Sequence, residues 1–271
     1  MDIIVPMHTP LMINKIGLID ADFIKYRVIN KVLKEMESKE IKIYDKTTNN
    51  IATYTQQEID RLLDWFNPKG LIFCFSGVTE HTYRYNVAYE KKYKGNRTSQ
   101  LLYEKQEDDK FSVIKYIKER YPTLLFKDLE ADDLISMLQD EDTFILSEDK
   151  DAEQCPGTHF DMKKGEFKEI SKKDAWVFLM RQMLLGDTVD NIGGLKSYGE
   201  ITVYELLTNT KVSDYHTAVL KAYTDIYGLT EGIDRFTETW NLVKLRLNRG
   251  TYFKSKYQLA FDTLEMIKLQ K

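Results

Sequence analysis

The sequence predicts an α/β fold, a mostly parallel sheet flanked by helices, followed by a region built of helices alone. Two observations predict the sheet: short apolar runs of strand length recur along the first 170 residues, and segments with helical spacing of apolar residues separate them. A third observation limits the sheet, because after Ser171 the strand-like runs stop. We therefore expect two regions, residues 1–170 and residues 171–271.

The strands are predicted from apolar runs that lie beside turn signals. Asn67-Pro68-Lys69-Gly70, for example, ends a helical pattern just before an apolar run. The predicted strands are Gly17–Asp20, Leu71–Phe75, Leu124–Phe126, Thr143–Leu146 and a hairpin over Thr158–Phe167 that turns at Lys163-Lys164-Gly165.

The helices are predicted from amphipathic spacing and from capping patterns. One helix follows the first strand as far as about Glu37, and a second begins at the capping-box pattern Thr55-Gln56-Gln57-Glu58 and ends near Phe66. The remaining predicted helices are Thr98–Tyr121, Leu134–Leu138, Lys172–Leu185, Ile201–Leu207 and an amphipathic closing helix over Tyr252–Lys271.

Length and composition indicate a chain that buries a full hydrophobic core. Its 271 residues are 42% hydrophobic, and no apolar stretch reaches the roughly 18 residues of a membrane span. The first 15 residues lack the features of a signal peptide. Cys74 and Cys155 have no metal-ligand spacing, which predicts free thiols. We expect a cytoplasmic protein that has no disulfide and does not bind membranes.

The net charge of −4 is unevenly distributed. Between His81 and Arg97 the charge is +4, so the rest of the chain carries −8. The cations of this basic segment are Arg84, Lys91, Lys92, Lys94 and Arg97, and tyrosines are interleaved with them. Cations attract phosphates and aromatic faces stack on unpaired bases, so the composition is typical of single-strand binding. A solvated basic helix is the alternative interpretation.

Four acidic clusters lie at the ends of predicted strands and helices. They are Asp20-Ala21-Asp22, Glu130-Ala131-Asp132-Asp133, Asp149-Lys150-Asp151 and Asp187-Thr188-Val189-Asp190. Because parallel strands end at one edge of a sheet, Asp20, Asp149 and Asp151 should lie together. Close carboxylates repel one another unless cations lie between them, so the clusters together predict a magnesium-dependent phosphodiesterase. Taken singly, each cluster is also typical of a helix start or a solvated turn.

The order of these motifs resembles the structure-specific 5′ nucleases, most closely the phage branch of 5′-3′ exonucleases, flap endonucleases and the ribonuclease H that removes primers. The matching segments are Leu18-Ile19-Asp20, Tyr83-Arg84 with Tyr93-Lys94-Gly95-Asn96-Arg97, Glu130-Ala131-Asp132-Asp133, Ser147-Glu148-Asp149-Lys150-Asp151 and Gly186-Asp187-Thr188-Val189-Asp190-Asn191-Ile192. The resemblance implies a PIN-like nuclease core over residues 1–170. It also implies a helical arch at about residues 80–121 and a helix-three-turn-helix module within a DNA-binding region at residues 171–271.

The resemblance further implies two metal sites. The first takes Asp20 and Asp132, with Glu130 or Asp133 nearby, and the second takes Asp149, Asp151, Asp187 and Asp190. Two Mg²⁺ ions suit such oxygen ligands, Mn²⁺ is expected to substitute for them, and K⁺ is a candidate ion for the glycine-rich turn at residues 191–199.

The resemblance also implies contacts with DNA. Lys94 and Arg84 are expected to contact the region of the scissile phosphate. The turn at residues 191–199 exposes backbone amides ahead of a helix, an arrangement that binds phosphate. The other expected DNA-binding residues are Tyr93, Lys91, Lys92, Arg97, Gly193, Gly194, Lys196 and Gly199.

Two positions depart from the family pattern. Ser76 stands where the family has an aspartate ligand of the first metal, and Gly199-Glu200-Ile201 lacks the lysine of the family's Gly-x-Lys sequence. Glu80 is a candidate replacement for the carboxylate, although a surface glutamate in a polar turn fits its position better. Lys196 is the candidate replacement for the lysine.

The expected activity is hydrolysis of phosphodiester bonds at the 5′ ends of DNA, at flaps or at RNA primers during DNA replication, leaving a 5′-phosphate. We expect a monomer, with a separate single-strand-binding protein as a candidate partner. Two alternatives remain open. One is a nucleic-acid-binding protein of the same fold with a weakened or lost nuclease site. The other is a phosphatase of the haloacid dehalogenase type, whose nucleophile motif Leu18-Ile19-Asp20-Ala21-Asp22 resembles.

Overall fold

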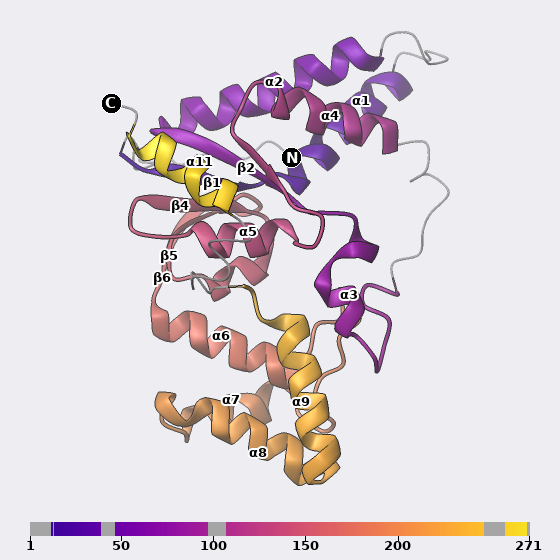
Figure 1. Ribbon diagram of the computed structural model, residues 1–271, viewed down its shortest axis with the longest axis vertical. Coiled ribbons are helices and arrows are strands. Elements are labelled where there is room, and N and C mark those ends of the chain that lie inside the picture. Colours follow the sequence, from indigo (N-terminus) through magenta and orange to yellow (C-terminus); the bar gives the residue numbers. More distant parts are fainter. Residues whose placement is uncertain (1–11, 13, 39–46, 97–106, 247–257, 270–271) are drawn as a thin grey trace.

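A single six-stranded sheet organises the upper part of the molecule (Figure 1). The computed structural model describes residues 12, 14–38, 47–96, 107–246 and 258–269. The strands are β1 (Ile16–Asp20), β2 (Gly70–Phe75), β3 (Thr123–Leu125), β4 (Thr143–Ser147), β5 (Gly157–Asp161) and β6 (Glu166–Ile170). Their order is β3-β2-β1-β4-β5-β6, and every neighbouring pair is parallel except the β5–β6 hairpin. The predicted mostly parallel α/β fold is confirmed.

The strand order places a switch point in the middle of the sheet. From β1 the chain passes to β2 and β3 on one side, and β4 then pairs with the other side of β1. The register aligns Asp20 with Cys74 and Ile19 with Leu146, so β1, β2 and β4 end at the same edge. Ligands of open α/β sheets bind beyond the carboxyl ends of the strands at such a switch point, so this edge is the expected position of a site.

Two layers of helices cover the sheet because successive side chains of each strand point to opposite faces. Ile19 packs on one face with α1 (Asp22–Ser38), α2 (Thr47–Phe66) and α4 (Glu107–Lys118). Leu18 packs on the other face, in a core that includes residues of α5 (Ala131–Leu138) and α11 (Gln258–Leu269). Both faces are therefore buried, which explains the continuous apolar runs of the central strands.

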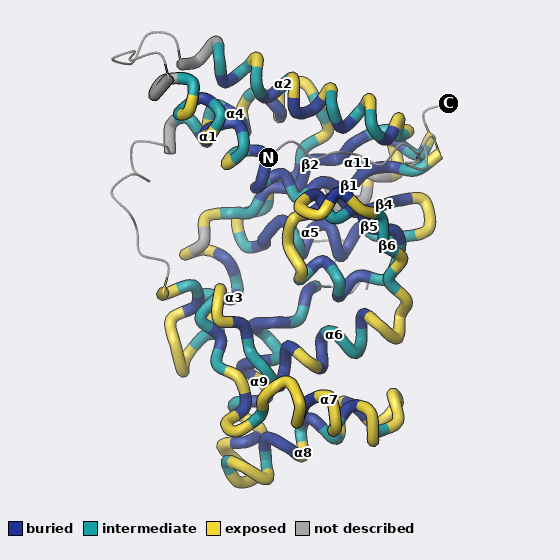
Figure 2. Tube along the Cα trace, turned by 180° about the vertical axis from the view of Figure 1, so that it is seen from behind, coloured by how far each residue is buried: buried dark blue, intermediate teal, exposed yellow. Residues whose placement is uncertain are grey.

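A separate hydrophobic core holds together the helices in the lower part of Figure 1. These helices are α3 (Tyr83–Val87), α6 (Lys172–Leu185), α7 (Glu200–Thr208), α8 (Tyr215–Tyr227) and α9 (Leu229–Val243). Short 3₁₀ helices lie at Thr79–His81, Lys150–Gln154 and Val212–Asp214. Figure 2 shows that α7 and α8 turn exposed residues outward at the far end of the molecule.

The structure corrects the start of one predicted helix and leaves the starts of two others untested. α2 begins at Thr47, well before Thr55, and the buried Thr55 hydroxyl donates to the carbonyl of Ile51 at 2.7 Å. The capping-box pattern therefore lies inside a helix, and the prediction that it starts one is wrong. α4 begins at Glu107 and α11 at Gln258, and the earlier parts of their predicted ranges, residues 98–106 and 252–257, lie outside the described residues.

Two smaller expectations can be compared directly with the structure. Cys74 and Cys155 are buried free thiols, as predicted. Among the described helices, none combines the length and the apolar character that crossing a membrane requires. The division of the chain near residue 170 stays a prediction. Ile267 of α11, although it follows that division, packs beside Gly70 of the sheet.

Candidate metal centre

A polar cavity of about 230 Å³ lies at the carboxyl edge of the sheet. Ser76, Tyr26 and the two cations Lys94 and Lys150 contribute to its wall. Its carboxylates are Asp20, Asp22, Glu130, Asp132, Asp149, Asp151, Asp187 and Asp190. All four acidic clusters thus meet in one place, and of the residues predicted to bind metal only Asp133 does not line the cavity.

Burial and mutual repulsion disfavour the ionised form of several carboxylates in this cavity. Burial, with help from Asp22 and Asp149, raises the pKa of Asp20 to about 7. Burial, Asp149 and Asp187 likewise raise the pKa of Asp151 to about 7. Burial also raises the pKa of Asp132 well above its ordinary range. A crowded set of oxygen ligands fits a hard divalent cation such as Mg²⁺, which would relieve the repulsion.

The first group of carboxylates comes from β1 and from the start of α5. Asp20 accepts hydrogen bonds from the Asp22 amide at 3.2 Å and from the Ser147 hydroxyl at 3.3 Å. Asp132 accepts a bond from the Asp133 amide at 2.7 Å. One carboxylate oxygen from each of Glu130, Asp132 and Asp133 lies within 4.8 Å of the others. These are the carboxylates of the first predicted metal site, and their role as ligands stays a prediction.

The second group comes from the loop after β4 and from the turn after α6. Asp149 accepts a bond from the Asp151 amide at 2.9 Å, and Gln182 donates to Asp151 at 2.7 Å. Asp187 accepts a bond from the Val189 amide at 2.8 Å. The Lys150 ammonium lies 2.8 Å from the other oxygen of Asp187, so a cation already neutralises part of this group.

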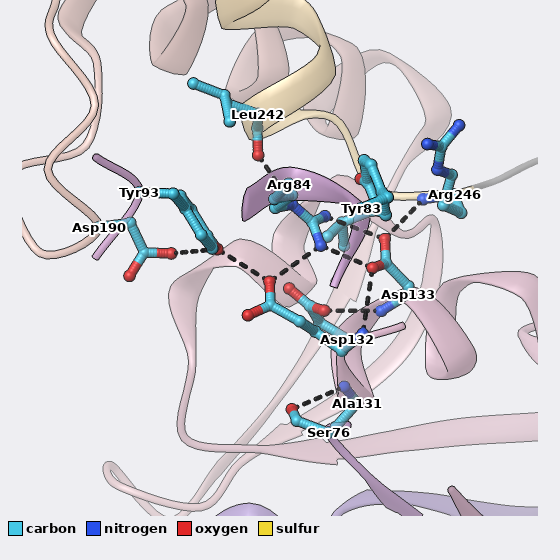
Figure 3. A network of polar contacts seen from close by, with 12 residues as sticks. Ser76, Tyr83, Arg84, Tyr93, Ala131, Asp132, Asp133, Asp190, Leu242 and Arg246 are labelled. Carbon is cyan, nitrogen blue, oxygen red and sulfur yellow. Dashed lines mark hydrogen bonds and ion pairs between the residues drawn. The ribbon is translucent and has the colours of Figure 1, made fainter. Parts of the chain in front are cut away.

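Arg84 does not line the cavity and lies in a buried network of polar contacts (Figure 3). Its side chain is only 2% exposed, and its guanidinium donates to both oxygens of Asp133, at 2.6 and 2.9 Å, and to Glu130 at 2.9 Å. Its Nε donates to the carbonyl of Leu242 at 2.8 Å. This burial does not fit the predicted contact of Arg84 with a phosphate, so we assign Arg84 the role of positioning Glu130. Asp133 does not line the cavity either, and its carboxylate accepts a hydrogen bond from the Glu130 amide at 3.4 Å.

Glu130 connects the buried pair of Arg84 and Asp133 to the cavity. Burial by itself disfavours the charge of Glu130, but the nearby Arg84 and Lys94 cations outweigh that effect and lower the pKa of the carboxyl. Glu130 therefore remains ionised next to Asp132, whose pKa is raised. The pKa values of Glu130 and Asp132 shift in opposite directions because Arg84 donates a hydrogen bond directly to Glu130.

Tyr93 joins the two groups of carboxylates. Its hydroxyl lies 2.8 Å from Glu130 of the first group and 2.8 Å from Asp190 of the second (Figure 3). The side chain is 3% exposed. Burial and the charge of Glu130 raise the pKa of Tyr93, so the hydroxyl keeps its proton. The predicted stacking of Tyr93 on a nucleic-acid base does not fit this burial.

The basic segment is held against the turn that carries Asp190. Lys94 has a left-handed backbone, with φ of 53°, and its amide donates to the carbonyl of Asp190 at 2.9 Å. Asn191 donates to the carbonyl of Lys92 at 2.9 Å, and Asn96 donates to that of Thr188 at 2.7 Å. The Lys94 ammonium consequently contacts Glu130 and lies 3.7 Å from Asp190.

The other residues predicted to bind DNA that the structure describes do not line the cavity, and most of them are exposed. Lys91, Lys92 and Lys196 are exposed, as are Gly194 and Gly199, and Gly193 is half-buried. Arg97 lies outside the described residues. A Cβ atom on Gly194 would lie 2.3 Å from the carbonyl oxygen of Leu185, so the close passage of the turn over the end of α6 requires glycine there.

Sequence reasoning named Asp22 within an acidic cluster but did not include it among the metal ligands. The structure places Asp22 in the cavity wall beside Ser76, whereas Glu80 is exposed and does not line the cavity. The signal was present in the sequence, since Asp20-Ala21-Asp22 ends a strand and starts a helix.

A larger hollow of about 890 Å³ lies among α6, α7 and α8. Its lining combines apolar residues such as Val177 and Tyr204 with the ion pair between Arg181 and Glu200 at 2.5 Å. No comparable set of carboxylates lines this hollow, so the acidic cavity is the candidate site.

The fold is the PIN-like nuclease fold, and solved structures share it. The bacteriophage T5 D15 protein co-crystallized with metal ions is similar with a TM-score of 0.62 and 17% identity, over 94% of this chain and 97% of that chain. The T5 5′-exonuclease with bound divalent zinc ions gives a TM-score of 0.59, with the same identity and coverage.

A third solved structure extends the likeness to a complex with nucleic acid. The T5 D15 flap endonuclease, in a pseudo-enzyme-product complex with DNA and metal ions, has a TM-score of 0.58 and 15% identity, over 94% of this chain and 100% of that chain. No protein-family model matches the chain, and no curated protein matches it. The expected resemblance to the structure-specific 5′ nucleases is confirmed at the level of the fold.

Proposed function

We propose that this chain is a divalent-metal-dependent 5′ nuclease that hydrolyses phosphodiester bonds at the 5′ ends of DNA, including flaps and RNA primers. The observation that carries the proposal is the convergence of four acidic clusters in one cavity at the switch point of the sheet. The haloacid dehalogenase alternative accounts for only one of these clusters, the one at Asp20.

In the proposed mechanism the two groups of carboxylates hold two Mg²⁺ ions. Asp20, Glu130 and Asp132 hold one ion, and Asp149, Asp151, Asp187 and Asp190 hold the other, either directly or through water. Ions bound there would supply the chemistry of activating water and stabilising the leaving oxygen of a phosphodiester. The protein supplies a fixed frame, because Arg84 and Tyr93 donate hydrogen bonds to Glu130 and Gln182 donates one to Asp151.

Lys94 is the residue that we propose to meet the scissile phosphate. Its ammonium lies at the cavity wall between Glu130 and Asp190, and its left-handed backbone holds it there. If metal ions neutralised these carboxylates, the ammonium would exchange its contacts with them for a contact with a phosphate of the substrate. Lys91 and Lys92 extend the positive surface away from the cavity along the proposed path of a single strand.

The glycine-rich turn is proposed to bind the duplex side of the substrate. α7 begins at Glu200 directly after the exposed Gly199, so backbone amides at the helix start are accessible to a phosphate. The proposal includes K⁺ at this turn, action as a monomer in the cytoplasm, and a separate single-strand-binding protein as partner. The T5 flap endonuclease that shares the fold was crystallised with DNA.

A cleavage assay tests the proposed function. The full chain, incubated with a 5′-flap DNA labelled at its 5′ end, should release short labelled products with Mg²⁺ or Mn²⁺ and none with EDTA. The same duplex without a flap and with blocked 5′ ends serves as the control. Intact DNA under all conditions, with the protein still bound to it, would instead support the alternative of a binding protein with a lost nuclease site, which Ser76 favours.

The exposed lysines of the basic segment make a second prediction. Lys92→Ala should weaken DNA binding and reduce the slope of log affinity against log salt by about one unit or less, because one phosphate contact is lost. Fluorescence anisotropy with flap DNA at several salt concentrations measures the slope. The matched control is Lys163→Ala, an exposed lysine in the β5–β6 turn, which should leave the slope unchanged. Equal slopes for wild type and Lys92→Ala would place the DNA elsewhere.

A further inference from the structure

Ser76 leaves the first group of carboxylates without a ligand from β2. The Ser76 hydroxyl instead accepts a hydrogen bond from the amide of Ala131, at 3.0 Å, so it satisfies a backbone donor at the start of α5 (Figure 3). A neutral hydroxyl adds no charge to an ion held by Asp20 and Asp132. If the first group is to offer a metal ion as many carboxylates as the second group does, another carboxylate has to supply that charge.

Asp22 is placed to supply it. Its carboxylate Oδ1 accepts a hydrogen bond from the Ser76 amide at 3.4 Å, so the Asp22 side chain lies over the end of β2. The Asp22 side chain is 26% exposed and lines the acidic cavity together with Asp20 and Ser76. Glu80, the alternative from sequence, is exposed outside this lining.

The backbone fixes the position of Asp22 relative to Asp20. The amide of the intervening Ala21 donates to the carbonyl of Cys74 at 2.9 Å, which extends the pairing of β1 with β2 past the end of the strand. The Asp22 amide donates to Asp20. α1 therefore begins in a defined orientation, and the two carboxylates enter the cavity from adjacent points of a rigid segment.

We propose that Asp22, from the start of α1, replaces the carboxylate that Ser76 does not provide, as an additional ligand of the first metal ion, directly or through water. This inference rests on the proposed function, because it concerns the same metal centre. Lys25 lies 2.6 Å from Asp22, but this contact and the Ser76 bond both use Oδ1. Coordination through Oδ2 would preserve both contacts.

Metal binding without DNA tests the assignment. The full chain is titrated with Mn²⁺, and free Mn²⁺ is measured by electron paramagnetic resonance. Asp22→Asn should weaken binding at one site by about tenfold, an effect of the size typical for residues that support a metal site. Ser76→Asp in the Asp22→Asn background should restore most of the lost affinity, because the carboxylate returns from β2. Glu80→Gln should leave affinity unchanged.

The variant Asp132→Asn distinguishes an error in the assignment of Asp22 from an error in the proposed metal centre. If Asp132→Asn weakens Mn²⁺ binding while Asp22→Asn does not, the assignment of Asp22 is overturned and the proposed centre stands. If Ser76→Asp fails to restore Mn²⁺ binding to Asp22→Asn, the proposal that Asp22 replaces a carboxylate at position 76 is likewise overturned. If the wild type binds no Mn²⁺ at all, both the inference and the proposed function fail. Melting temperatures of all variants verify that each one is folded.

Discussion

Asp132→Asn should lower the single-turnover rate of flap cleavage by about a hundredfold or more, while DNA affinity measured without Mg²⁺ stays within a few-fold of wild type. Asp132 lines the cavity with Asp20 and Glu130, and losing one charged oxygen weakens the electrostatic stabilisation on which the proposed reaction depends. An asparagine retains an oxygen that accepts the bond from the Asp133 amide, so the start of α5 should keep its structure.

The control for this variant is Asp64→Asn, which removes an exposed carboxylate from α2. Its cleavage rate and DNA affinity should both match wild type. A rate near that of wild type for Asp132→Asn would contradict the assignment of Asp132 to the metal centre. An equal loss in Asp64→Asn would show that the effect is one of net charge rather than of position.

Arg84→Met should reduce the free energy of unfolding by about 3–5 kcal/mol, because it leaves the buried carboxylate of Asp133 without its cation and removes one of the two cations that contact Glu130. Urea denaturation followed by circular dichroism measures the change. Arg120→Met is the matched control, because the Arg120 pair with Glu119 is exposed and such surface pairs contribute little.

A double variant distinguishes the broken charge pair from lost packing. In Arg84→Met with Asp133→Leu, the most buried carboxylate is removed together with its cation, so the loss of stability should be smaller than in Arg84→Met alone. An additive loss would contradict the assignment of the effect to an unpaired charge. A loss in Arg84→Met no larger than in Arg120→Met would show that the cluster contributes little to stability.

The strands and the meeting of the carboxylates could be predicted from the sequence because both depend on local patterns. Apolar runs identified the parallel strands, and the rule that such strands end at one edge brought Asp20 and Asp149 together. Propensity and capping patterns were less decisive, as Thr55 shows. Its hydroxyl bonds to the preceding turn of a helix that tertiary packing extends in the amino-terminal direction.

The roles of Arg84 and Tyr93 could not be predicted, because burial depends on partners that are distant in sequence. Arg84 bonds to the carbonyl of Leu242, and Tyr93 to Asp190. Both residues lie in a segment whose composition resembles an exposed basic helix. Neither charge nor spacing distinguishes a cation that faces a phosphate from one that neutralises carboxylates inside the protein.

The position of the Tyr93 hydroxyl has a thermodynamic consequence for the proposed centre. A phenol carries one hydrogen, so it can donate fully to Glu130 or to Asp190 but not to both at once. A cation that engages one of these carboxylates shifts the hydrogen toward the other. Occupancy of the two proposed metal sites would then be coupled, and by reciprocity each ion would change the affinity of the protein for the other ion by the same factor.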